Sequence, residues 1–261
     1  SITKEGKQYL SERVTNTEED VYVFTDKISA TTVAAAMARL SRRGDDMRVA
    51  ILDEFTEKEG KDEDLLKRVI TAYGDDSVQQ LSGIHFVVEG ASNLLTKKLE
   101  WGRLAAYLEQ STRYIFFDQK DENGKFKYYT PTNLDEKMTQ KYNQIMDSIF
   151  EKYSEMVHKL TEHVIANSNE PKESRDGAWK AAIRAQACDA ARPVLPVATK
   201  ATVGIFASGQ ALESLIMHLQ SDELKESNHT GDKLLNEARK VVPTFLERAD
   251  KPSRGGAWVA H

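Results

Sequence analysis

The sequence has one cysteine, no long apolar run and no excess of basic charge. A lone thiol, Cys188, cannot close an internal disulfide, which favours a reducing compartment. No stretch approaches the roughly 18 apolar residues that a membrane span needs, and the first residues lack the apolar core of a signal peptide. A net charge of -5 argues against general nucleic-acid binding. These absences predict a cytoplasmic protein.

Common ligand motifs are missing as well. The sequence contains neither GxGxxG nor GxxxxGK[ST], the two frequent phosphate-binding loops. Its 6 histidines show no metal-ligand spacing with the cysteine. We therefore expect no metal site, and any phosphate has to be held by side chains.

Helical periodicity dominates what is present. Apolar stripes and capping residues predict helices over 29–43, 62–73, 93–108, 134–166, 174–192, 209–225 and 231–248. Short β-branched and aromatic runs predict strands at 84–88, 114–117 and 127–129, all in the first half of the chain. We predict one helix-rich α+β domain over 1–261 with a small antiparallel sheet. Residues 249–261 are a tail or the start of a further segment.

The most informative stretch is LEWGRLAAYLEQSTRYIFF, residues 99–117. It predicts a helix carrying Arg103 that continues into an extended segment. Alternate side chains of an extended chain face the same way, so Glu109, Ser111 and Arg113 are expected on one side. These groups can bind a polar ligand, and the guanidinium fork suits a phosphate. Spacing alone fits an exposed strand face with a local ion pair even better.

The run EQSTRY at 109–114 resembles the end of the signature RHRxxSxNExSxRY of the flavin-dependent thymidylate synthases, the ThyX family. Five residues match that signature: Arg103, Glu109, Ser111, Arg113 and Tyr114. Three more segments resemble family segments and occur in family order: ARLS at 38–41, YGDDS at 73–77 and ARPVLP at 191–196. The resemblance therefore covers most of the chain.

The resemblance implies an α+β fold and a homotetramer with active sites between subunits. It also implies a reaction in which FAD takes hydride from NADPH, methylenetetrahydrofolate supplies one carbon, and dUMP becomes dTMP. The cofactor carries the difficult chemistry. No protein nucleophile is required, which agrees with Cys188 lying in an ordinary helical sequence.

Individual roles are also implied by the resemblance. Ser111 and Arg113 are assigned as catalytic. The residues expected to hold dUMP are Glu109, Ser111, Arg113, Tyr114 and Arg192. The residues expected to contact the cofactor are Ser41, Ser77, Gln80, Trp101, Arg103, Ser208 and Gln210.

Several positions depart from the family pattern. Trp101 and Gly102 stand where the signature has Arg and His, and Gln80 stands where the family has a glutamate. Ser208-Gly209-Gln210 replaces Asn-x-Arg, and Leu219 replaces a further arginine. Three readings stay open. The chain is an enzyme with a divergent flavin site, an enzyme for a related reaction, or a non-catalytic structural or regulatory module, such as one half of a tandem protein.

Overall fold

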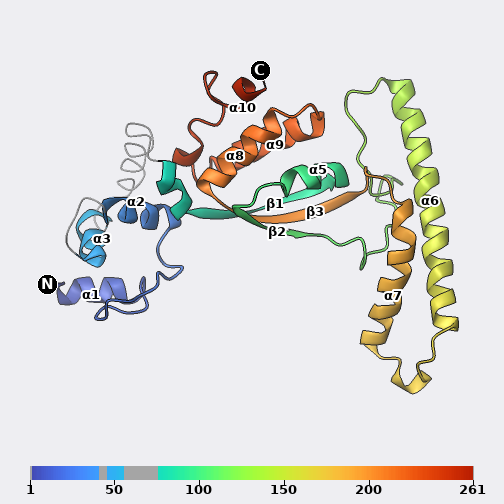
Figure 1. Cartoon of the computed structure of the whole chain (residues 1–261), viewed down its shortest axis with the longest axis horizontal. Coiled ribbons are helices and arrows are strands. Elements are labelled where there is room, and N and C mark those ends of the chain that lie inside the picture. Colours follow the sequence, from blue (N-terminus) through green and yellow to red (C-terminus); the bar gives the residue numbers. More distant parts are fainter. Residues whose placement is uncertain (1, 41–45, 56–75, 261) are drawn as a thin grey trace.

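The computed structural model describes residues 2–40, 46–55 and 76–260 (Figure 1). Its centre is an antiparallel sheet in the order β1 (Gly83–Ser92), β3 (Lys200–Ser208), β2 (Ala105–Glu109). The strand that comes last in the sequence lies in the middle, where Gly204 of β3 pairs with Val87 on one side and Leu108 on the other. The sheet therefore depends on contacts between distant parts of the chain.

The α-helices have the following bounds: α1 (Lys4–Ser11), α2 (Ala30–Leu40), α3 (Met47–Phe55), α5 (Asn93–Leu99), α6 (Glu136–Ala166), α7 (Gly177–Ala191), α8 (Gly209–Gln220), α9 (Lys225–Ala238) and α10 (Gly256–Val259). Short 3-10 helices are η2 (Asp76–Leu81), η3 (Lys172–Ser174), η4 (Arg192–Val194) and η5 (Thr244–Leu246). The described part of the chain therefore combines many helices with one small sheet.

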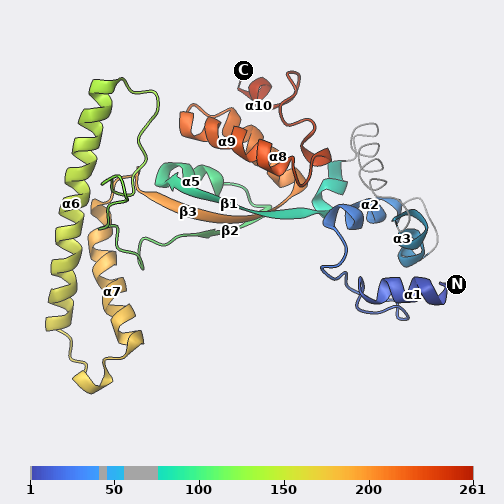
Figure 2. The same cartoon turned by 180° about the vertical axis from the view of Figure 1, so that it is seen from behind.

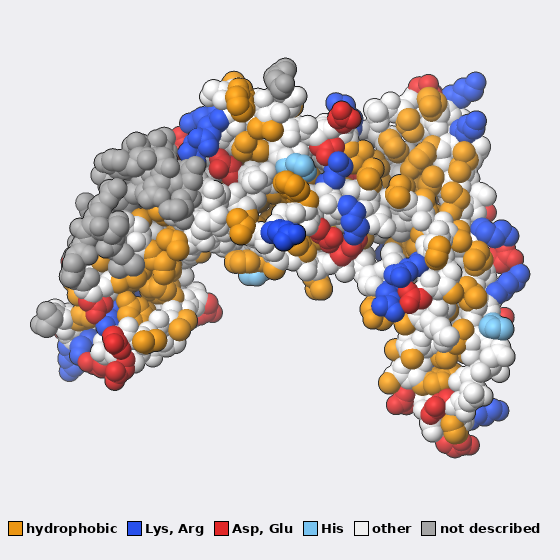
Figure 3. Space-filling model, in the orientation of Figure 1, with side chains coloured by type: hydrophobic (Ala, Val, Ile, Leu, Met, Phe, Trp, Pro, Cys, Tyr) orange, Lys and Arg blue, Asp and Glu red, His pale blue; other side chains and the backbone are white. Residues whose placement is uncertain are grey.

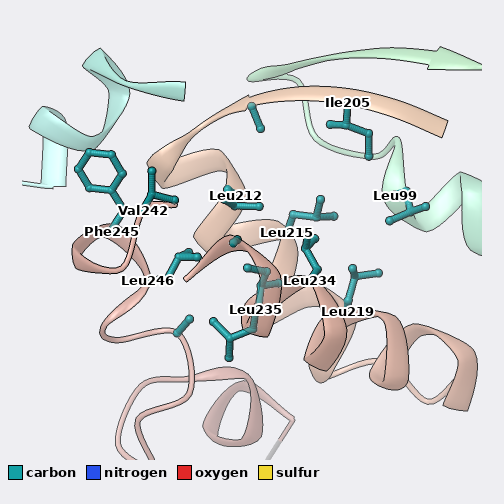
Figure 4. Close-up of a cluster of buried hydrophobic side chains, with 14 of the residues drawn as sticks. Leu99, Ile205, Leu212, Leu215, Leu219, Leu234, Leu235, Val242, Phe245 and Leu246 are labelled. Atoms are coloured by element: carbon teal, nitrogen blue, oxygen red, sulfur yellow. The ribbon is translucent and has the colours of Figure 1, made fainter. Parts of the chain in front are cut away.

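One face of the sheet forms the main core. Helices α5, α8 and α9 lie over this face in both views (Figures 1 and 2). In Figure 4, Leu212, Leu215 and Leu219 of α8 lie between Ile205 of β3 and the leucines of α9. Burying such a side chain contributes about 1.5–3 kcal/mol. The core thus fixes α8 against the end of β3.

Two further clusters lie at the ends of the molecule. Helices α1, α2 and α3 surround one of them, and α6 packs along α7 around the other. In the α6–α7 cluster, Phe150, Tyr153 and Val157 of α6 meet Ala187 and Cys188 of α7. In Figure 1, α1 and α7 lie below the sheet, on the side away from α8 and α9, whereas α6 extends past the sheet to both sides. The space-filling view shows a hollow beneath the sheet (Figure 3).

The structure confirms the helix-rich α+β fold with a small antiparallel sheet. The strand at 84–88 corresponds to β1, and the long helix at 134–166 corresponds to α6. The helix predicted at 62–73 lies outside the described residues.

Several predictions of secondary structure were wrong. The helix expected over 93–108 ends at Leu99, and residues 105–109 form β2. Residues 105–109 favour a helix by themselves, but their pairing with β3 makes them a strand. Gly102 also disfavours a helix that continues past Leu99. All strands were expected in the first half of the chain, but β3 lies in the second half, and its alternating buried residues are Ala201, Val203, Ile205 and Ala207. This period of two was a signal for a strand.

The strands expected at 114–117 and 127–129 also do not form. Residues 115–120 are irregular, and Tyr128 makes only an isolated bridge with Thr199. Phe117 and Tyr128 are instead buried in the α6–α7 cluster. At the C-terminal side, the helix expected over 231–248 is α9, which ends at Ala238 before Pro243.

Candidate functional site

The loop between α5 and β2, residues 100–104, is tied down by Tyr107. The Tyr107 hydroxyl donates to the carbonyl oxygen of Gly102 at 2.8 Å. A Cβ at position 102 would lie 3.1 Å from that hydroxyl, so a small residue fits there. Partial burial raises the pKa of Tyr107, which keeps the hydroxyl a donor. This hydrogen bond holds the loop that carries Trp101 and Arg103.

This loop forms one wall of a pocket of about 540 Å³, hereafter the Trp101 pocket. Such a volume is within the range of small-molecule sites. Its lining comes from the loop, β2, the end of β3 and α8: Trp101, Gly102, Arg103, Leu104, Ala105, Tyr107, Ala207, Gln210, Ala211, Ser214 and Leu215. Of these described residues, only Arg103 carries a charge.

Trp101 is positioned by an aromatic contact. Its ring stacks on His218 of α8, with centroids 4.7 Å apart and planes at 18°. Trp101 is nevertheless 61% exposed, so much of its surface is available to a ligand. A planar aromatic ligand that also carries a negative group would match the indole and Arg103.

Gln210 belongs to a neutral hydrogen-bond network. The Ser208 hydroxyl donates to Oε1 of Gln80 at 2.7 Å, and the amide nitrogen of Gln80 donates to the side-chain oxygen of Gln210. Ser208 also caps α8 by accepting from the backbone of Ala211 at 3.3 Å. Residues from η2, β3 and α8 are joined in this way without any charge.

The structure thus brings together five of the positions assigned to the cofactor. Trp101, Arg103 and Gln210 line the pocket, and Gln80 and Ser208 support Gln210. Ser77 lies in η2, but its side chain is outside the described part, as is Ser41 altogether.

Arg113 and Arg192, hereafter the arginine pair, lie at one carboxylate. Nη2 of Arg113 donates to Oδ2 of Asp189 at 2.8 Å. Nη2 of Arg192 lies 3.1 Å from Oδ1 of the same residue and forms an ion pair with it. Both arginine side chains remain about half exposed, at 49% and 45%.

The common face expected for Glu109, Ser111 and Arg113 is not formed. The pairing of β2 with β3 stops after Gln110 donates to the carbonyl of Thr202 at 2.8 Å. A turn follows, in which the Arg113 backbone donates to the Ser111 hydroxyl at 3.2 Å. The side chains therefore leave the chain in directions that strict alternation does not give.

Glu109 and Tyr114 make their own contacts. Glu109 forms an ion pair with Lys97 of α5 at 3.0 Å. Partial burial lowers the pKa of Lys97, but the interactions with Glu109 and Glu100 outweigh it and the net shift is upward. Tyr114 is exposed, with its backbone donating to Ser111 at 3.4 Å. Both remain predicted substrate contacts.

Sequence reasoning missed Asp189, His218 and Tyr107. Asp189 lies three residues before Arg192 on a predicted helix, a spacing that places side chains next to each other and was a usable signal. The contacts of His218 with Trp101 and of Tyr107 with Gly102 depend on the fold, and no local pattern indicates them.

The thiol and the metal-binding side chains can be assessed in the described part of the chain. Cys188 is fully buried, and burial raises the pKa of its thiol, which makes it a poor nucleophile. Across 2–40, 46–55 and 76–260, no group of three or more metal-binding side chains comes together. None of the described helices is long and apolar enough to span a membrane.

Comparison with known proteins gives matches along most of the chain. Residues 24–244 match the family model of thymidylate synthase complementing proteins. The UPF0159 protein of Chlamydia pneumoniae is 33% identical over 272 residues, which cover 95% of this chain and 50% of that protein. A flavin-dependent thymidylate synthase of Clostridium tetani is 26% identical over 180 residues, covering 69% and 67%. The chain spans about half the length of the first curated relatives it matches.

A solved structure has a similar fold. The flavin-dependent thymidylate synthase ThyX of Helicobacter pylori, complexed with FAD and dUMP, superposes with a TM-score of 0.58. The match covers 85% of this chain and 96% of that chain at 16% identity. At this identity the likeness concerns the fold.

Proposed function

The chain belongs to the family of thymidylate synthase complementing proteins, and on that premise we propose that it binds FAD in the Trp101 pocket and dUMP at the arginine pair. In this proposal it forms dTMP by reductive methylation, with methylenetetrahydrofolate and NADPH as co-substrates. The family's solved relative from Helicobacter pylori is complexed with FAD and dUMP, which supports both ligands.

The Trp101 pocket fits a flavin by its chemistry. Trp101 offers a planar ring, Leu104 and Leu215 offer apolar contact, and Arg103 offers a positive charge for a phosphate. When bound, FAD would supply the hydride transfer that no side chain can perform. The protein's part is to hold the ring through Trp101 and to orient polar groups through Gln210 and its neutral network.

One observation carries the nucleotide site. Arg113 and Arg192 come from distant parts of the sequence, yet both guanidinium groups lie within 3.1 Å of one carboxylate. An anion bound between two arginines is the arrangement that suits a phosphate. Ser111, whose hydroxyl accepts from the backbone of Arg113 at 3.2 Å, would support the same turn and contact the nucleotide with Glu109 and Tyr114.

The alternative is a non-catalytic homologue that keeps the fold as a structural or regulatory module. The neutral Gln80–Ser208–Gln210 network favours it, because the resemblance expects charged partners at two of these positions. Assembly as a homotetramer with sites between subunits and a cytoplasmic location belong to the enzymatic proposal.

Release of tritium from C5-labelled dUMP tests the proposal. The protein is supplied with FAD, NADPH and methylenetetrahydrofolate, and dTMP is quantified in parallel. The enzyme reading predicts both products, their loss in Arg113→Ala, and their retention in Arg254→Ala, which removes an exposed arginine of the C-terminal segment. Flavin and dUMP binding without either product would favour the non-catalytic module.

A further inference from the structure

The carboxylate of Asp189 lies where the two guanidinium groups of the arginine pair converge. Its Oδ2 accepts from Arg113 at 2.8 Å, and its Oδ1 is 3.1 Å from Nη2 of Arg192. Oδ1 is shielded from solvent and accepts no hydrogen bond within the described part of the chain. Asp189 lies on α7, one helical turn before Arg192, a spacing that makes the two side chains neighbours.

Folding alone gives little reason for this arrangement. Ion pairs between exposed side chains contribute little to stability, and both arginines are about half exposed. The carboxylate has a larger effect on the charge of the site, because it lowers the combined charge of the three groups from two positive charges to one. Any anion that approaches the arginine pair has to compete with it.

We propose that Asp189 is an internal competitor for the phosphate group, so that it sets the affinity of the site for nucleoside monophosphates. The inference rests on the proposed nucleotide site. A phosphate dianion brings about two charges and three acceptor oxygens, which is more than the single carboxylate offers, and it displaces Asp189 from the guanidinium groups. An uncharged nucleoside makes no such exchange.

Asp189→Asn removes the charge and keeps the size of the side chain. Titration calorimetry with dUMP and with deoxyuridine then separates the effect on the phosphate from any effect on the base and sugar. We expect dUMP to bind about tenfold more tightly to the variant, because a negative charge close to the ligand has been removed. Affinity for deoxyuridine stays unchanged.

Two further variants serve as controls. Asp189→Glu keeps the charge and should keep the weaker affinity for dUMP. Glu155→Gln removes one surface charge of α6 that is paired with Lys152 and Lys159, and it should leave dUMP binding unchanged. If Asp189→Asn is unstable, Asp189→Ser provides the same loss of charge for the comparison.

The outcomes separate this inference from the function on which it rests. Weaker binding of dUMP by a well-folded Asp189→Asn variant would mean that Asp189 positions the arginines for the ligand, which overturns the competitor role and leaves the nucleotide site intact. If neither the natural chain nor Asp189→Asn binds dUMP, both ideas fail. Binding by the variant alone supports the competitor role.

Discussion

The arginine pair and the Trp101 pocket differ in how they depart from the family pattern. The arginine pair keeps the two charged residues that the resemblance assigns to the nucleotide, and both guanidinium groups face Asp189. At the Trp101 pocket, neutral residues stand at positions where the resemblance expects charged ones. Arg103 is the only charged residue among the described lining residues. A phosphate needs opposite charge, whereas a planar ring can also be held by stacking. In the proposed function, the different chemistry of the two ligands accounts for this difference between the regions.

The exchanged residues of the pocket are in contact with one another. Gln80 and Gln210 occupy positions where the family resemblance expects a glutamate and an arginine, and their side chains are hydrogen bonded. Gln80 is exposed and Gln210 is half-buried, so a neutral hydrogen bond stands near the surface where the resemblance expects two opposite charges. An exposed ion pair contributes little to stability, so its replacement costs the fold little.

The largest expected effect is on the arginine pair. Arg113→Ala should weaken dUMP binding about ten- to hundredfold, because a hydrogen bond to a charged group contributes about 1.5–3 kcal/mol. FAD retention should be unchanged, since Arg113 does not line the Trp101 pocket. Calorimetry with dUMP measures the loss, with Arg254→Ala as the control. If Arg113→Ala weakened dUMP binding and FAD binding equally, the two regions would not be separate sites.

Arg103→Ala tests the separation of the two regions at the Trp101 pocket. Arg103 is exposed and supplies the only charge among the described lining residues of the pocket. Its removal should weaken FAD binding about tenfold, through lost charge-assisted hydrogen bonds, and leave dUMP binding unchanged. Fluorescence quenching of added FAD measures this. An unaltered FAD affinity would mean that Arg103 does not bind the phosphates of FAD.

Trp101→Ala should have a smaller effect on FAD. An aromatic pair contributes about 0.5–1.5 kcal/mol beyond the area it buries, so we expect a loss of about two- to tenfold. Trp258→Ala is a matched control, because Trp258 is similarly exposed at 58% but lies on α10. The idea of a stacking platform is wrong if both variants bind FAD equally well.

The smallest effect on binding is expected for Tyr107→Phe. It removes the hydrogen bond to Gly102 and loosens the loop of residues 100–104. Stability should fall by about 1 kcal/mol, measured by chemical denaturation, and FAD affinity should fall about twofold. A large loss of dUMP binding would contradict the separation between the two regions.

The sequence predicted the fold where local pattern and environment agree. The apolar stripe of α6 and the β-branched run of β1 each have one strong period. Residues 105–109, by contrast, are good helix formers that become β2 only because β3 pairs with them. Such pairing is decided by residues nearly a hundred positions away and leaves no local signal.

The sequence likewise identified some residues of the candidate site and missed others. The motif EQSTRY identified Arg113, and ARPVLP identified Arg192, but the carboxylate between them is a consequence of how α7 packs against the loop after β2. The Gln80–Ser208–Gln210 network likewise joins η2, β3 and α8, so residues that look like separate departures in the sequence form one arrangement in space.

The most direct measurement is the visible absorbance of the protein after incubation with excess FAD and removal of free cofactor. The proposed function predicts a flavin band at close to one equivalent per chain. The band should be reduced in Trp101→Ala and in Arg103→Ala and unchanged in Arg113→Ala. A colourless protein with the circular dichroism of a folded, helix-rich chain would contradict it, because the neutral pocket would then not be a flavin site.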